Sequence, residues 1–118
     1  MTQRYLFIAD QALFAGSACR DLLDMALSAA AFDQPASLLL RGPATLWVAT
    51  SHARPGAIGH KDLFRQLGAL PVYGIEPIHV AEDDFRRFAS EPPMAGCLML
   101  DEAGVAALIR EHDRVIQL

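Results

Sequence analysis

His79 is the residue in this sequence whose surroundings most suggest a reactive site. It lies in the stretch "GIEPIHVAEDDFRRF", residues 74–88, where a short apolar segment runs into a pattern typical of a helix. Reactive groups of open parallel sheets collect at the carboxyl ends of strands, so His79 is a candidate site residue. A lone histidine between apolar neighbours is more often a half-buried, hydrogen-bonded residue. No serine or cysteine stands beside it, so no nucleophile–base pair can be argued.

Cys19 is the second candidate. It lies in the first turn of a predicted helix, where unpaired backbone N–H groups favour a thiolate, and Arg20 is adjacent. The alternative is a small hydrophobic residue packed under the preceding loop, because free cysteines are often buried. The sequence favours the second interpretation. Cys97 lies inside the apolar stretch 96–100 and is predicted to belong to the core.

Metal, nucleotide and phosphoryl-transfer chemistry are not indicated. The four histidines have no i, i+4 partner and no nearby thiolate pair, so no metal site is predicted. The loop after the first predicted strand contains one glycine and matches neither glycine-rich phosphate-binding motif, so no cofactor is expected. A response-regulator site needs an acidic pair at that loop, where Asp10 stands alone, and a lysine after the last strand, which is missing.

Composition limits the class of protein further. A chain of 118 residues matches one domain, residues 1–118. The net charge of −4 argues against direct nucleic-acid binding, which needs a basic surface. No signal peptide, membrane span or disulfide framework is indicated, so a soluble cytoplasmic protein is expected. Hydrophobic residues make up 53% of the chain, which favours burial of some surface against another chain.

Strands and helices are predicted to alternate along the chain. Five short apolar segments read as strands and four longer segments as helices, with Asp101 as the cap of the last helix. The strands are expected at residues 4–9, 36–40, 75–80, 96–100 and 114–118, and the helices at 18–32, 61–70, 82–89 and 102–112. Continuously apolar strands that alternate with helices indicate a single-domain, three-layer α/β/α fold with a five-stranded parallel sheet.

Two surfaces have more apolar character than a lone domain requires. The helix at 18–32 has one narrow polar stripe, so its apolar face, which includes Leu23 and Leu27, is wider than packing on a sheet needs. Trp47 lies in the irregular segment 41–60, where a short turn of helix is expected near residues 46–49. It could form an exposed contact patch or a lid folded over its own sheet, and the sequence does not separate the two.

Three stretches together resemble the DsrE/DsrF-type sulfur-relay proteins, and most of all the TusC/DsrF subunit type. The stretches are "FAGSACRDLLDMALSAAAFD", "KDLFRQLGALPVYGIEPIHVAEDDFRRF" and "HDRVIQL". The similarity covers nearly the whole chain, through loose patterns of apolar and small residues. It is weakest over residues 41–60.

The resemblance implies a place in an assembly. Members of this family form hexamers from three related subunits, with two copies of each. The TusBCD type passes persulfide sulfur towards 2-thiouridine at the tRNA wobble position, and the DsrEFH type serves sulfur oxidation. The sulfur-carrying cysteine belongs to the TusD/DsrE sibling, where the third strand meets the next helix. The alignment places His79 at that cysteine, and imidazole cannot form a persulfide.

The resemblance therefore predicts a non-catalytic structural subunit with TusB-like and TusD-like partners, without a cofactor. Its expected contact residues are Leu23, Leu27, Trp47 and Leu118, the last at the end of a strand expected to be buried. Three alternatives stay open: a persulfide carrier that uses Cys19, a DsrEFH-type subunit, and a small-ligand binding module with the Trp47 segment as a lid.

Overall fold

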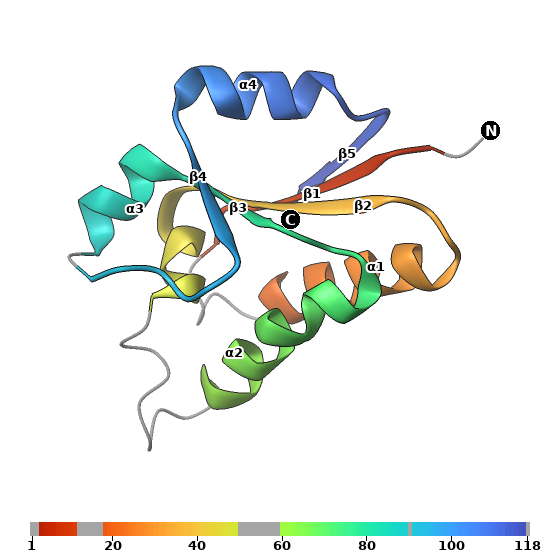
Figure 1. The fold of residues 1–118 in the computed structure, drawn as a ribbon, viewed down its shortest axis with the longest axis horizontal. Coiled ribbons are helices and arrows are strands. Elements are labelled where there is room, and N and C mark those ends of the chain that lie inside the picture. The colour runs from red at the N-terminus through yellow and green to blue at the C-terminus, as the bar shows by residue number, and fades with distance from the viewer. Residues whose placement is uncertain (1–2, 12–17, 50–59, 90, 118) are drawn as a thin grey trace.

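The computed structural model describes residues 3–11, 18–49, 60–89 and 91–117, with the side chains of residues 18–19 and 60–64 left aside. Five strands form one sheet in the order β4-β3-β2-β1-β5, and every neighbouring pair is parallel (Figure 1). The strands are β1 (Tyr5–Ala9), β2 (Ala36–Leu40), β3 (Ile78–Ala81), β4 (Cys97–Leu100) and β5 (Arg114–Gln117). The predicted five-stranded parallel sheet is confirmed.

Helices cover both faces of this sheet. The α-helices are α1 (Ala18–Ala31), α2 (His60–Ala69), α3 (Glu82–Phe88) and α4 (Glu102–Arg110), and the 3-10 helices are η1 (Gly42–Val48) and η3 (Leu70–Tyr73). Figure 1 shows α4 on one face and α1 and α2 on the other, with α3 beyond the end of β3. The predicted three-layer α/β/α arrangement is confirmed.

The core consists of two apolar clusters, one on each face, because successive side chains of a strand point to opposite faces. Phe7 and Leu38 belong to the larger cluster, which also includes residues of α1 and η1. Leu6 and Leu39 belong to the smaller cluster, where Leu108 of α4 covers them. Strands β1 and β2 are therefore buried on both faces, which explains why their sequences are continuously apolar.

Local chemistry sets several element boundaries. The Asp101 carboxylate accepts a hydrogen bond from the Gly104 N–H at 2.7 Å, which confirms the predicted cap of α4. β3 begins at Ile78, three residues later than predicted. Pro77 precedes it and has no N–H to give to a strand ladder, whereas the Ile78 N–H bonds the Gly96 carbonyl at 2.9 Å.

The prediction that the last strand is buried is wrong. β5 is an edge strand, and its residues Arg114, Val115 and Gln117 are exposed. The apolar pair Val115–Ile116 suggested a central strand, but strand order is not encoded in the periodicity of a single segment. Leu118, the predicted contact residue at this end, lies outside the described residues.

The segment after β2 folds over the sheet of its own chain. The predicted helical turn is longer than expected and begins earlier, as η1, with a proline in its first turn. Trp47 is 1% exposed, and its indole N–H donates to the Gln11 carbonyl oxygen at 3.0 Å. Of the two interpretations of Trp47, the structure supports a residue folded over its own sheet, and the exposed contact patch is wrong.

Candidate functional site at the carboxyl end of β3

His79 lies within β3 and not at the junction of strand and helix. It is the second of four strand residues, between Leu39 of β2 and Leu98 of β4 in the sheet register. The junction is at Ala81, after which α3 begins directly at Glu82. The sequence analysis placed the junction closer to His79. In the structure the strand continues through Val80 and Ala81, two apolar residues that carry no signal for a strand end.

The imidazole of His79 is held by the backbone of the neighbouring strand. Its Nδ1 lies 3.2 Å from the Leu38 carbonyl oxygen, and because that oxygen can only accept, Nδ1 carries the proton and donates. The side chain is half-buried and shares the α4 face of the sheet with Ala81. This is the half-buried, hydrogen-bonded histidine that the sequence left as one interpretation.

The surroundings of His79 favour the neutral imidazole. Burial lowers the pKa of His79 from its ordinary value of 6.5, and the hydrogen bond to Leu38 opposes that shift. Nearby His112 lowers the pKa further, and Glu111 raises it. His112 is itself fixed, with Nδ1 2.7 Å from the Leu108 carbonyl oxygen and Nε2 3.1 Å from the Ser37 hydroxyl. At neutral pH, His79 is therefore an uncharged residue of the sheet surface.

The lowered pKa of His79 predicts a pH-dependent stability. The unfolded chain binds a proton at His79 at a higher pH than the folded chain does, so the free energy of unfolding should decrease as pH falls below about 6.5. His79→Gln removes this titration, and its urea-unfolding curve should lose less stability between pH 7 and pH 5 than the wild type. Equal losses in the two proteins would contradict the prediction.

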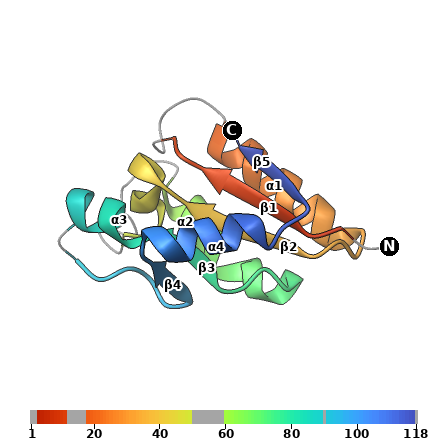
Figure 2. The same cartoon turned by 90° about the horizontal axis from the view of Figure 1, so that it is seen from above.

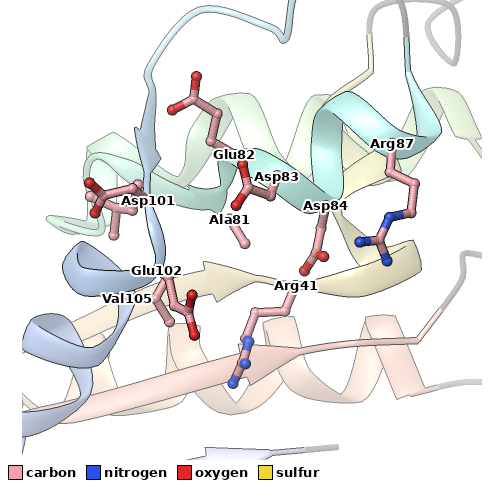
Figure 3. Close-up of a pocket in the computed structure, with 10 residues that line it drawn as sticks. Arg41, Ala81, Glu82, Asp83, Asp84, Arg87, Asp101, Glu102 and Val105 are labelled. Carbon is pink, nitrogen blue, oxygen red and sulfur yellow. The ribbon is translucent and has the colours of Figure 1, made fainter.

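A charged cavity of about 240 Å³ lies at the carboxyl end of the sheet, next to His79 but not lined by it (Figure 3). Its charged lining residues are Arg41, Glu82, Asp83, Asp84, Arg87, Asp101 and Glu102. They come from the end of β2, from α3, and from the junction of β4 with α4. Sequence reasoning did not select them as site residues, although acidic residues directly after two predicted strands were a usable signal.

Two of these carboxylates serve the fold. Asp84 accepts the Gly42 N–H at 2.8 Å, and Gly42 has a φ of +54°, a conformation that favours glycine. Asp101 caps α4 as described above. None of the residues that line the cavity is a cysteine, serine or histidine, so the cavity as described holds no nucleophile of the kind that accepts sulfur.

The thiol that the structure describes, that of Cys97, is not suited to sulfur transfer. Cys97 of β4 pairs with Ile78 of β3 and packs against the larger cluster. Its thiol is half-buried, whereas the sequence predicted a core residue. Burial raises the pKa of the Cys97 thiol to about 11, so almost none of it is thiolate at neutral pH. Cys19 lies in the first turn of α1, as predicted, but its side chain is outside the described part of the structure.

The predicted contact residues on α1 also belong to the chain's own core. Leu23 is 1% exposed within the larger cluster, which corrects its choice as a contact residue. Leu27 is partly buried against the same cluster. The side chains of α1 that do reach the surface are neighbours of these, and they include Met25 at 38% exposure. A wide apolar helix face was a correct observation, but much of it packs on η3 and on strands β1 and β2.

Neither a metal centre nor a membrane-spanning helix is found in the described part of the chain. No three of its His, Cys, Asp and Glu side chains are grouped closely enough to hold a metal ion. None of its helices is long and apolar enough to cross a bilayer.

The fold is that of a known class of small α/β proteins. The structure matches the crystal structure of the YchN protein from E. coli with a TM-score of 0.77, over 99% of this chain and 100% of the other, at 14% sequence identity. No protein-family model matches the chain. A protein of Pseudomonas aeruginosa named TusC homolog is 31% identical over 120 aligned positions that cover both chains completely. The chain belongs to the TusC family of DsrE/DsrF-like sulfur-relay proteins, which confirms the resemblance seen in the sequence.

Proposed function

We propose that this chain, as one DsrE/DsrF-like domain over residues 1–118, is a non-catalytic structural subunit of a cytoplasmic sulfur-relay heterohexamer. Its partners would be TusB-like and TusD-like siblings, and the complex would support sulfur transfer for 2-thiouridine formation at the tRNA wobble position. Membership of the TusC family supports the relay, and the site itself supports the non-catalytic role.

One observation carries the non-catalytic role. His79, which the resemblance aligns with the sibling's acceptor cysteine, is half-buried and bound through Nδ1 to the Leu38 carbonyl. A persulfide needs a thiolate to accept sulfane sulfur, and a neutral imidazole in this position offers none. The Cys97 thiol, on the neighbouring strand, stays protonated at neutral pH because of its raised pKa.

The test is co-expression of this chain with the two sibling chains, followed by native mass and persulfide mapping on the purified complex. We expect a three-component complex in which labelled sulfane sulfur appears on the TusD-like sibling and on neither Cys19 nor Cys97. Cys97→Ser and Cys19→Ser should each leave the labelling of the sibling unchanged. A homo-oligomer that carries sulfur on Cys19 would overturn the proposal and make this chain the carrier.

The choice of pathway needs a separate readout. Deletion of the gene for this chain should lower the 2-thiouridine content of the tRNAs that carry it, and the wild-type chain and His79→Ala should both restore it. An unchanged 2-thiouridine content, together with an intact three-component complex, would favour the sulfur-oxidation type. Failure of His79→Ala to restore a normal content, in a complex that assembles, would contradict a non-catalytic role for this position.

A further inference from the structure

β5 leaves one edge of the sheet open. Among the described residues it pairs with β1 alone, and Figure 2 shows it at the border of the sheet beside α1. The Arg114 N–H bonds the Arg4 carbonyl at 3.1 Å, so Arg114 and Ile116 direct their backbone groups towards β1. Because these groups alternate along a strand, Val115 and Gln117 direct theirs away from the sheet.

Apolar side chains lie on both sides of this open edge. On the α4 side, Val115 is 45% exposed. On the α1 side, a groove of about 460 Å³ runs between the helix and the sheet, and Phe7 and Ile116 are among its lining residues. Phe32, which also lines this groove, is 78% exposed. An apolar surface that continues around a strand edge is suited to an occupant that extends the sheet and packs on both faces.

We propose that two copies of this chain join through their β5 strands in antiparallel orientation, with the two-fold axis at Ile116. This rests on the proposed function in one respect, namely that the assembly holds two copies of the chain. The outward-facing residues lie symmetrically about Ile116, so Val115 of each copy meets Gln117 of the other. Both pairs are of the hydrogen-bonded type, and together they make four backbone hydrogen bonds.

The self-complementary register is the reason for choosing a second copy as the occupant. An axis at Val115 would give only one hydrogen-bonded pair, because the Asp113 N–H also bonds the Arg4 carbonyl and is not available. Arg114 is the only charged residue of β5. In the proposed register the two Arg114 residues lie four positions apart, roughly 13 Å along the strands, which exceeds the Debye length of about 8 Å at physiological salt.

The same symmetry fills the groove. A two-fold axis perpendicular to the sheet leaves both α1 helices on the same face, flanking the central Ile116 pair. Each groove then opens towards the other copy, and the exposed Phe32 and Met25 gain an apolar partner surface. A stable interface buries roughly 800 Å² per partner, contributed by about 20–30 residues a side, whereas β5 has four residues. The contact should therefore be strongest inside the full complex, where sibling contacts add to it.

A cysteine placed at the axis tests this geometry. Opposite residues of a non-hydrogen-bonded antiparallel pair have Cα atoms about 4.5 Å apart, within the range that a disulfide spans. We expect Ile116→Cys, in a Cys19→Ser/Cys97→Ser background and purified in the complex with its siblings, to give a dimer of this chain under mild oxidation. Val115→Cys is the matched control, because it is exposed but its two copies lie roughly 8 Å apart, beyond the limit for a disulfide.

Strong cross-linking of Ile116→Cys with little for Val115→Cys supports the proposal. The proposal is overturned if the two variants cross-link equally, if neither cross-links, or if the cysteine of Ile116→Cys forms its disulfide with a sibling chain. If siblings do not co-purify, the proposed function fails, and the same pair of variants in the chain alone still tests the β5 contact. Val115→Pro provides a second measurement, because it removes an outward N–H and leaves the bonds to β1 in place. Combined with Ile116→Cys in the complex, it should abolish most of the cross-link between the two copies, and an unchanged cross-link would overturn the proposal.

Discussion

Trp47→Ala should lower the free energy of unfolding by about 3–5 kcal/mol, the range seen when a buried tryptophan or phenylalanine is truncated to alanine. Trp47 is the largest fully buried side chain of the described residues, and it joins η1 to the larger core cluster. Its loss removes the apolar contacts, leaves a cavity under η1, and frees the Gln11 carbonyl from the indole N–H. Urea unfolding followed by far-UV circular dichroism measures the change.

Trp47→Phe is the matched control for this prediction. It keeps most of the ring volume and loses the part-buried hydrogen bond to Gln11, so we expect a smaller loss of about 1–2 kcal/mol from that bond and from the smaller ring. A contact residue on the surface would behave in the opposite way, with normal stability and impaired assembly. A loss below about 1 kcal/mol for Trp47→Ala would therefore contradict its place in the core.

Leu23→Glu should leave the chain largely unfolded. Leu23 is 1% exposed, so the substitution exchanges about 2–5 kcal/mol of apolar packing for a carboxylate in an apolar site. A buried charge without a partner costs several kcal/mol more, and typical domains have only about 5–15 kcal/mol of stability in total. The expected readout is loss of soluble protein and of the cooperative unfolding transition.

Met25→Glu tests the same helix two positions further along. Met25 is 38% exposed, so its substitution should leave the unfolding transition close to the wild type. It lines the groove beside β5, where an added carboxylate should weaken the contact between two copies. A folded Leu23→Glu protein that only fails to assemble would show that Leu23 is a contact residue after all, as the sequence suggested.

Most elements could be predicted because their signals are local. The apolar run at β2 (Ala36–Leu40) and the Asp101 cap each depend on a few adjacent residues, and both are found where expected. Trp47 and Leu23 were harder to place, because an apolar side chain has the same signal whether its own chain or a partner covers it. The position of β5 at the sheet edge depends on strand order, which no single segment encodes.

The site was predicted in part. His79 is on β3 as expected, but it is held inside the strand, and the cavity at the strand end begins at Ala81. The residues that surround this cavity come from three separate segments of the chain, and only the sheet brings Arg41 and Glu102 to the same edge. The neighbours of Cys97 in the sequence were enough to assign it to a strand. Its half-buried state could not be predicted, because it follows from the position of β4 at the edge of the sheet.

The strand order also has a consequence for synthesis on the ribosome. Among the described strands β1 is made first, yet one of its two neighbours is β5, which is made after the other four, and the bond between the Arg4 N–H and the Asp113 carboxylate joins residues 109 positions apart. While β1 to β4 can pair as they emerge, the far side of β1 stays uncovered until residues 114–117 have left the exit tunnel. The nascent chain thus presents an apolar strand edge for most of its translation, and a chaperone that binds extended apolar segments would find it there.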